Sequence, residues 1–137
     1  MDQPYFAQWQ PSYSVGHRVL DEQHKKLLDL CQQAIQCMSD DSRDGLDLFH
    51  DILNDLSSYV NEHFRTEEAL LALCGYPQLE QHKEEHTDYQ LKLTDFLLSA
   101  TLGEINKEGL HHYLSHWWSE HILGSDRQYT AAVQGFR

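Results

Sequence analysis

The chain has 137 residues and a formal net charge of −12, from 10 basic and 22 acidic side chains. This length suits a single domain with one hydrophobic core, and the acidic excess disfavours binding to nucleic acid or to an anionic membrane surface. The longest apolar runs, such as residues 69–74, are too short to cross a membrane. The first residues lack the basic start and apolar centre of a signal peptide. We therefore expect one cytoplasmic domain without membrane insertion.

The three cysteines, Cys31, Cys37 and Cys74, are odd in number and form no CxxC pair. On a straight helix Cys31 and Cys37 would be about 9 Å apart in rise alone, which is too far for a disulfide. We expect reduced thiols that pack as small apolar groups, in keeping with a reducing compartment.

The first segment of the chain is predicted to be irregular. Pro4, Pro11 and Gly16 interrupt regular secondary structure. We expect residues 1–16 to form an extended arm that packs on the rest of the domain through its aromatic side chains, Tyr5, Phe6, Trp9 and Tyr13.

Helices are predicted in four later segments, residues 18–39, 43–73, 77–100 and 106–133. Asp21 and Glu22 would lie in the first helical turn, where acidic groups favour the helix dipole. A polar turn with capping side chains, residues 39–42, would separate the first two helices. Gly75 would end the second helix and Pro77 would open the third.

Apolar residues recur three and four positions apart in each predicted helix, as on a helix with one buried face. Short loops favour antiparallel neighbours. The predicted fold is all-α: an up-down-up-down antiparallel four-helix bundle over residues 17–134, preceded by the arm, within one domain spanning 1–137. Polar residues occupy the buried stripe where a bundle expects Leu or Val, at His24, His63, Glu67, His82, His86 and His121.

These polar positions should share one end of the bundle. They lie near the start of the first and third helices and near the end of the second and fourth, and those four ends meet in such a bundle. Burying each group without a partner would cost about 2–7 kcal/mol, and more for a charged group. A cluster of five imidazoles and two carboxylates, with Asp126 as the second carboxylate, favours a dinuclear transition-metal site.

Asp126 does not follow the regular helical period. It comes five residues after His121, so on an ideal helix it would point about 140° away from the stripe. One inserted residue, such as a π-bulge at Gly124 or Ser125, would turn the carboxylate back toward the cluster. We therefore predict an irregularity between residues 121 and 126.

Five other histidines do not fit the stripe. His112 and His116 form an HxxxH pair but face away from His121, and His50 is also off the stripe of its helix, so we expect these three in solvent. His111 has an intermediate direction. His17 falls at the first helical turn, either beside the cluster or as a surface or capping residue.

Six motifs follow one another between residues 9 and 129: Asp21-x-x-His24-Lys25, His63-Phe64-x-x-Glu67-Glu68, Gly75-Tyr76-Pro77, His82-x-x-x-His86, Trp117-x-x-x-His121-Ile122 and Asp126-x-x-Tyr129. Together they resemble the hemerythrin family, specifically the bacterial hemerythrins and hemerythrin-like domains. The resemblance covers nearly the whole chain.

This resemblance implies a cofactor of two non-haem iron ions, bridged by Glu67, Asp126 and an oxo or hydroxo group. It places His82, His86 and His121 on one ion. The other ion would take His24 and His63 and keep an open position for O2. We expect a dry, apolar O2 pocket whose wall is formed by Leu20, Leu27, Leu28, Leu114 and Trp117.

Reversible O2 binding for transport, storage or sensing is the leading interpretation, rather than an enzyme activity. The chain could be a stand-alone carrier or a sensor domain with a fused or partner signalling domain. The alternative is a di-iron redox enzyme, such as an oxidase, peroxidase or NO reductase, although ferritin-like catalytic sites are richer in carboxylates. A zinc-stabilised module is a third class, but a tetrahedral site gives no reason for seven converging ligands.

Overall fold

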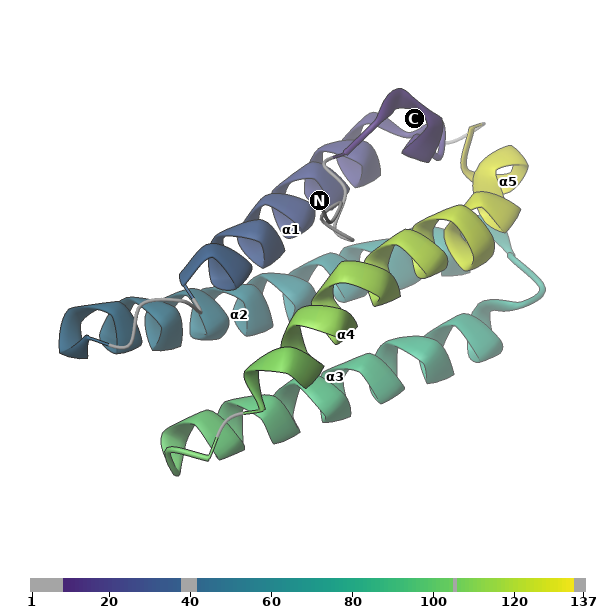
Figure 1. The fold of residues 1–137 in the computed structure, drawn as a ribbon. Coiled ribbons are helices and arrows are strands. Elements are labelled where there is room, and N and C mark those ends of the chain that lie inside the picture. The colour runs from purple at the N-terminus through teal and green to yellow at the C-terminus, as the bar shows by residue number, and fades with distance from the viewer. Residues whose placement is uncertain (1–8, 38–41, 105, 135–137) are drawn as a thin grey trace.

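The computed structural model describes residues 9–37, 42–104 and 106–134. Within these ranges the chain is helical without strands, and its long helices run alternately up and down as an antiparallel bundle (Figure 1). The long helices are α1 (Arg18–Cys37), α2 (Arg43–Cys74), α3 (Leu79–Thr101) and α4 (Lys107–Glu120). The predicted all-α four-helix bundle is confirmed.

The arm joins α1 through a network of short hydrogen bonds. Gly16 has a φ of 77°, in the left-handed region that favours glycine, so the chain can turn sharply into the helix. Asp21, in the first turn of α1, accepts hydrogen bonds from the Ser14 hydroxyl at 2.6 Å and from the Val15 N–H at 2.9 Å. His17 is buried, and its Nδ1 lies 3.4 Å from the Leu20 N–H. Of the two roles left open for His17, the structure favours capping.

The described part of the arm packs on the bundle as predicted. Pro11–Tyr13 form a short 3-10 helix, η1, with Tyr13 buried in the core and Trp9 packed against it. The Lys25 ammonium lies 4.5 Å from the centre of the Trp9 ring, which is within the range of a cation–π contact. Tyr5 and Phe6 lie outside the described residues.

The second helix, α2, ends at a glycine in the left-handed conformation, which begins the connection to α3. Gly75 has a φ of 68°, and the Tyr76 N–H donates to the Leu71 carbonyl at 3.0 Å, which caps the end of α2. The prediction that Pro77 opens the third helix is wrong by two residues. The Leu79 N–H donates to the Tyr76 carbonyl at 3.2 Å, so a closed turn precedes the helix.

The fourth segment is helical but irregular. After α4 the chain forms a π-helix, η2 (His121–Asp126), then a 3-10 turn, η3 (Arg127–Tyr129), and a last short helix, α5 (Thr130–Gln134). The Arg127 N–H donates to the Ile122 carbonyl, five residues earlier, which is the bond of a π-helix. The predicted irregularity between residues 121 and 126 is confirmed.

Two apolar clusters fill the interior and leave a polar layer between them. The larger one takes in the long helices and includes a buried hydrogen bond of 2.9 Å from Trp118 Nε1 to the Tyr89 hydroxyl. The smaller one closes the end of the bundle where the arm and α5 lie, and contains Val15, Leu20, Leu71, Tyr129 and Val133. None of the helices in the described ranges combines the length and apolar composition needed to cross a membrane.

Truncation of a core side chain should destabilise this bundle strongly. Leu53 has no exposed surface, so Leu53→Ala should lower the free energy of unfolding by about 2–5 kcal/mol, because it removes apolar contacts and leaves a cavity. Leu48→Ala, on the same helix but 52% exposed, is the control and should change it by about 0.5 kcal/mol or less. Equal losses in the two variants, measured by denaturant unfolding, would contradict this packing.

Candidate metal centre

Seven polar side chains converge in the polar layer between the two apolar clusters. They come from the start of α1, the end of α2, the start of α3 and the π-helix η2. Their exposed fractions run from 0 to 4%. The structure thus brings together every residue that the sequence placed in the cluster: His24, His63, Glu67, His82, His86, His121 and Asp126.

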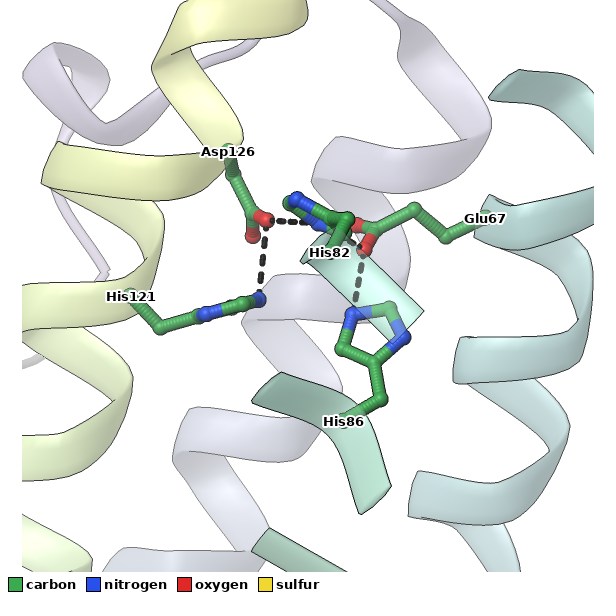
Figure 2. Close-up of side chains that lie close together, drawn as sticks. All are labelled: Glu67, His82, His86, His121 and Asp126. Carbon is green, nitrogen blue, oxygen red and sulfur yellow. Dashed lines mark hydrogen bonds and ion pairs between the residues drawn. The ribbon is translucent and has the colours of Figure 1, made fainter. Parts of the chain in front are cut away.

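Glu67 lies between two groups of histidines. Its Oε1 is 2.9 Å from the Nε2 atoms of His82 and His86, and Figure 2 shows how these side chains face one another. Its Oε2 turns the other way and lies 3.6 Å from His24 Nε2 and 3.4 Å from His63 Nε2. The carboxylate therefore offers one oxygen to each group.

Asp126 spans the same two groups. Its Oδ1 lies 2.9 Å from His82 Nε2 and 3.0 Å from His121 Nε2 (Figure 2), and its Oδ2 lies 3.1 Å from His24 Nε2. The nitrogens divide accordingly into a three-histidine group and a two-histidine group. The three-histidine group is His82, His86 and His121, and the two-histidine group is His24 and His63.

Most of these atoms approach one another without forming hydrogen bonds. Within the described residues, the buried atoms left without a hydrogen-bond partner include both oxygens of Asp126 and the Nε2 atoms of His24, His63, His86 and His121. Unpaired buried polar atoms are costly. Lone pairs that converge on a common space are what metal ions would satisfy, so the donor set fits metal binding.

The π-helix explains how Asp126 reaches the cluster. Residue 126 would point away from His121 on a regular helix, but the extra residue in η2 turns its carboxylate inward, where it is fully buried. The same turn points the Ser125 hydroxyl at Glu85 Oε1, 2.6 Å away. One irregularity therefore orients two side chains.

Three of the cluster histidines form a hydrogen bond through Nδ1, the ring nitrogen that faces away from the cluster. His63 Nδ1 lies 2.7 Å from Gln23 Oε1, His86 Nδ1 lies 2.7 Å from Glu68 Oε2, and His121 Nδ1 lies 3.0 Å from Glu85 Oε1. Because the partner atoms are acceptors, each Nδ1 carries a proton and each Nε2 faces the cluster, where its lone pair can bind a metal ion when the ring is neutral.

Sequence reasoning missed Gln23, Glu68 and Glu85 as partners. Each is adjacent in sequence to a member of the cluster, at the edge of the buried stripe, and that adjacency was the only available signal. Each contacts a histidine on a different helix, so the pairing depends on how the helices pack.

Aromatic rings flank the cluster on the side of the main core. Phe64 stacks on His86 with ring centres 3.7 Å apart, and Trp117 stacks on His121 at 4.3 Å. The Tyr129 hydroxyl donates to Glu67 Oε2 at 2.7 Å from the opposite side. These contacts restrict the orientations of the rings and of the carboxylate.

The residues predicted to line an O2 pocket are divided between the two clusters. Leu27, Leu28 and Leu114 are buried in the main core, while Leu20 belongs to the smaller cluster. Trp117, also expected in the pocket wall, is only partly buried, and its neighbour Trp118 is fully buried. Their role in an O2 pocket stays a prediction.

The remaining histidines lie outside the cluster. His112 is exposed and His116 half-exposed, with ring centres 4.3 Å apart on the outer side of α4. His50 and His111 have intermediate burial. The expectation of solvent exposure therefore holds fully only for His112.

In the absence of bound metal, ion pairs shift the pKa values of the cluster. Burial disfavours a charged His24, but contacts with Asp126 and Glu67 outweigh burial and raise its pKa to about 9. The same balance raises the pKa of His82 to about 10 and that of His121 to about 9. The histidines in turn lower the pKa of both carboxylates, although burial opposes this.

Fold and site together define a class, a helical bundle with a buried cluster of histidines and carboxylates that could hold metal ions. The family model for the hemerythrin HHE cation binding domain matches residues 15–133. The chain therefore belongs to the hemerythrin family.

Individual relatives agree with this assignment. A bacteriohemerythrin of Clostridium acetobutylicum is 29% identical over 88% of this chain and 96% of its own length. A hemerythrin-like protein of Naegleria gruberi is 31% identical over 91% of this chain and 92% of its own. A crystal structure of wild-type hemerythrin superposes with a TM-score of 0.85 at 22% identity, covering 93% of this chain and 98% of that one, which supports the fold.

The shifted pKa values predict how the metal-free protein responds to pH. The histidines with raised pKa contribute stability that is complete below their unfolded value of 6.5 and is lost as pH rises toward 9 to 10. The carboxylates contribute stability that is present above their unfolded values of 3.8 and 4.5 and is lost as pH falls below them. Denaturant unfolding should therefore show declining stability from pH 7 to 9. A rise over that interval would contradict the ion pairs.

Insertion of one residue into the π-helix should abolish the site. An alanine inserted between Gly124 and Ser125 would place the carboxylate six residues after His121, so that even with the π-helix it would point about 140° away from the cluster. We expect loss of metal from the insertion variant, measured by elemental analysis after reconstitution, with retention of helical circular dichroism. His112→Ala is the control and should bind metal as the unaltered protein does. Unchanged metal content in the insertion variant would show that η2 does not position the carboxylate.

Proposed function

We propose that this protein binds O2 reversibly at a non-haem di-iron centre, for transport, storage or sensing. O2 binding at such a centre is the function that membership of the hemerythrin family indicates. The observation that carries the proposal is the division of both buried carboxylates between two groups of imidazoles.

Two metal ions account for this division. One iron ion would take the three-histidine group with one oxygen from each carboxylate. The other would take the two-histidine group with the remaining two oxygens, so that Glu67 and Asp126 bridge the pair together with an oxo or hydroxo group. Imidazole and carboxylate donors suit iron. The second ion has one protein ligand fewer, which leaves a position for O2.

Bound iron would supply the electrons that O2 takes up, and the protein would supply the surroundings. The cluster is buried, which excludes bulk water from the centre. We propose that the apolar residues expected from the sequence admit O2 and keep the site dry: Leu20, Leu27, Leu28, Leu114 and Trp117.

The seven candidate metal ligands favour reversible O2 binding over enzymatic turnover of O2. Five imidazoles and two carboxylates leave every buried titratable group of the cluster with a ligand role, and Tyr129 is engaged by Glu67. A di-iron redox enzyme, acting as an oxidase, peroxidase or NO reductase, is the alternative that the experiment below separates.

The same proposal covers organisation and location. We propose one domain over residues 1–137, with the arm at 1–16 and the bundle at 17–134, in a cytoplasmic protein that acts as a carrier or works with a fused or partner signalling domain. The three cysteines are unpaired thiols, which suits a reducing compartment.

Anaerobic reduction followed by exposure to O2 tests the function. The reconstituted protein should contain two iron ions per chain, and O2 should produce an optical absorption band that disappears when O2 is removed. One iron ion per chain would contradict the dinuclear site. Rapid release of hydrogen peroxide without such a band would favour the enzyme.

Glu67→Ala provides the matched variant. Because Glu67 contacts both groups of histidines, its removal should lower the occupancy of both iron positions together and abolish the O2-dependent band. Loss of a single ion would show that this carboxylate serves only one position. His112→Ala should retain both ions and the band.

A further inference from the structure

The Nδ1 atoms of the cluster histidines, which face away from the cluster, have partners of different charge. In the three-histidine group, His86 and His121 donate from Nδ1 to the carboxylates of Glu68 and Glu85. In the two-histidine group, His63 donates to the neutral amide of Gln23. His24 Nδ1 is buried and has no hydrogen-bond partner among the described residues.

Each of the two carboxylates is well placed to act on its histidine. Glu68 Oε2 lies 2.7 Å from His86 Nδ1, with 27% of the side chain exposed. Glu85 is 34% exposed, and the Ser125 hydroxyl of the π-helix fixes its Oε1 at 2.6 Å. Both groups therefore combine contact with a buried imidazole and contact with solvent.

The charge of the acceptor changes the donor strength of the imidazole. A carboxylate draws the Nδ1 proton toward itself, so the ring becomes more electron-rich and its Nε2 binds a cation more tightly. A neutral amide orients the ring with less of this effect. An imidazole without a partner gains neither.

We propose that Gln23, Glu68 and Glu85 are positioning residues that make the two metal positions unequal. Glu68 and Glu85 strengthen the three-histidine position, so that it fills first and retains its ion. Gln23 orients His63 without adding charge and leaves the two-histidine position the weaker one. This inference rests on the proposed di-iron function and extends it to the order of metal loading and to the reduction potential.

Titration of the metal-free protein with Co²⁺ under anaerobic conditions tests the inequality without O2 chemistry. The unaltered protein should bind two ions in two resolved steps, followed by calorimetry and visible absorption. Glu85→Gln and Glu68→Gln keep an acceptor for Nδ1 but remove the charge, and each should weaken the first step by about 10–100-fold while leaving the second unchanged. Gln23→Glu should strengthen the second step and bring the two together.

Matched variants separate a local effect from one of net charge. Glu84 is exposed on α3 beside Glu85, and Glu62 is exposed on α2 before Glu68. Glu84→Gln and Glu62→Gln change the charge by the same amount and should leave both steps unaltered. Glu85→Asp restores the charge and should recover much of the first-step affinity. All titrations use a His112→Ala, His116→Ala background, which removes binding at the surface pair.

The reduction potential of the iron-loaded protein is the second readout. Loss of an anionic partner disfavours the more highly charged ferric state, so Glu85→Gln should raise the potential and Glu84→Gln should not. The inference is overturned if the unaltered protein binds two Co²⁺ ions and O2 while the three variants leave both steps and the potential unchanged. Binding of a single Co²⁺ by the unaltered protein would instead overturn the di-iron function, and this inference with it.

Discussion

The end of the bundle depends on keeping two carboxylates and five imidazoles buried at one depth. Glu67 and Asp126 have no exposed surface, and isolated charges in such a place would be prohibitively costly. Without metal, the raised pKa values of His24, His82 and His121 indicate that imidazolium groups offset the two negative charges. With metal, cations would take over that role. The contacts at the second ring nitrogens of His63, His86 and His121 hold these rings in the same orientation in either case.

The cost of this arrangement is visible in the backbone. A continuous α-helix would have kept regular hydrogen bonds between residues four apart through this segment, yet residues 121–126 form a π-helix followed by a 3-10 turn. The irregularity aims Asp126 at the cluster and Ser125 at Glu85. A local departure from ideal helix geometry is thus tied directly to the chemistry of the site, as is common for π-bulges.

Partly exposed side chains are in direct contact with the buried cluster. Glu68 and Glu85 are partly exposed, yet each contacts a histidine that is almost fully buried. Gln23 occupies the corresponding place for His63. Side chains at the edge of the buried stripe therefore contact the outer ring nitrogens of buried histidines, and substitution there can alter charge without disrupting the core.

The sequence by itself determined the helices, the bundle and the membership of the cluster, because a period of 3.6 residues selects which side chains share a face and short loops select antiparallel neighbours. It also indicated the irregularity before Asp126. Only the tertiary structure decided the full burial of Trp118 and the pairing of Gln23, Glu68 and Glu85 with histidines on other helices. Those features depend on the rotation and offset of helices that are distant in sequence, and no local pattern encodes these.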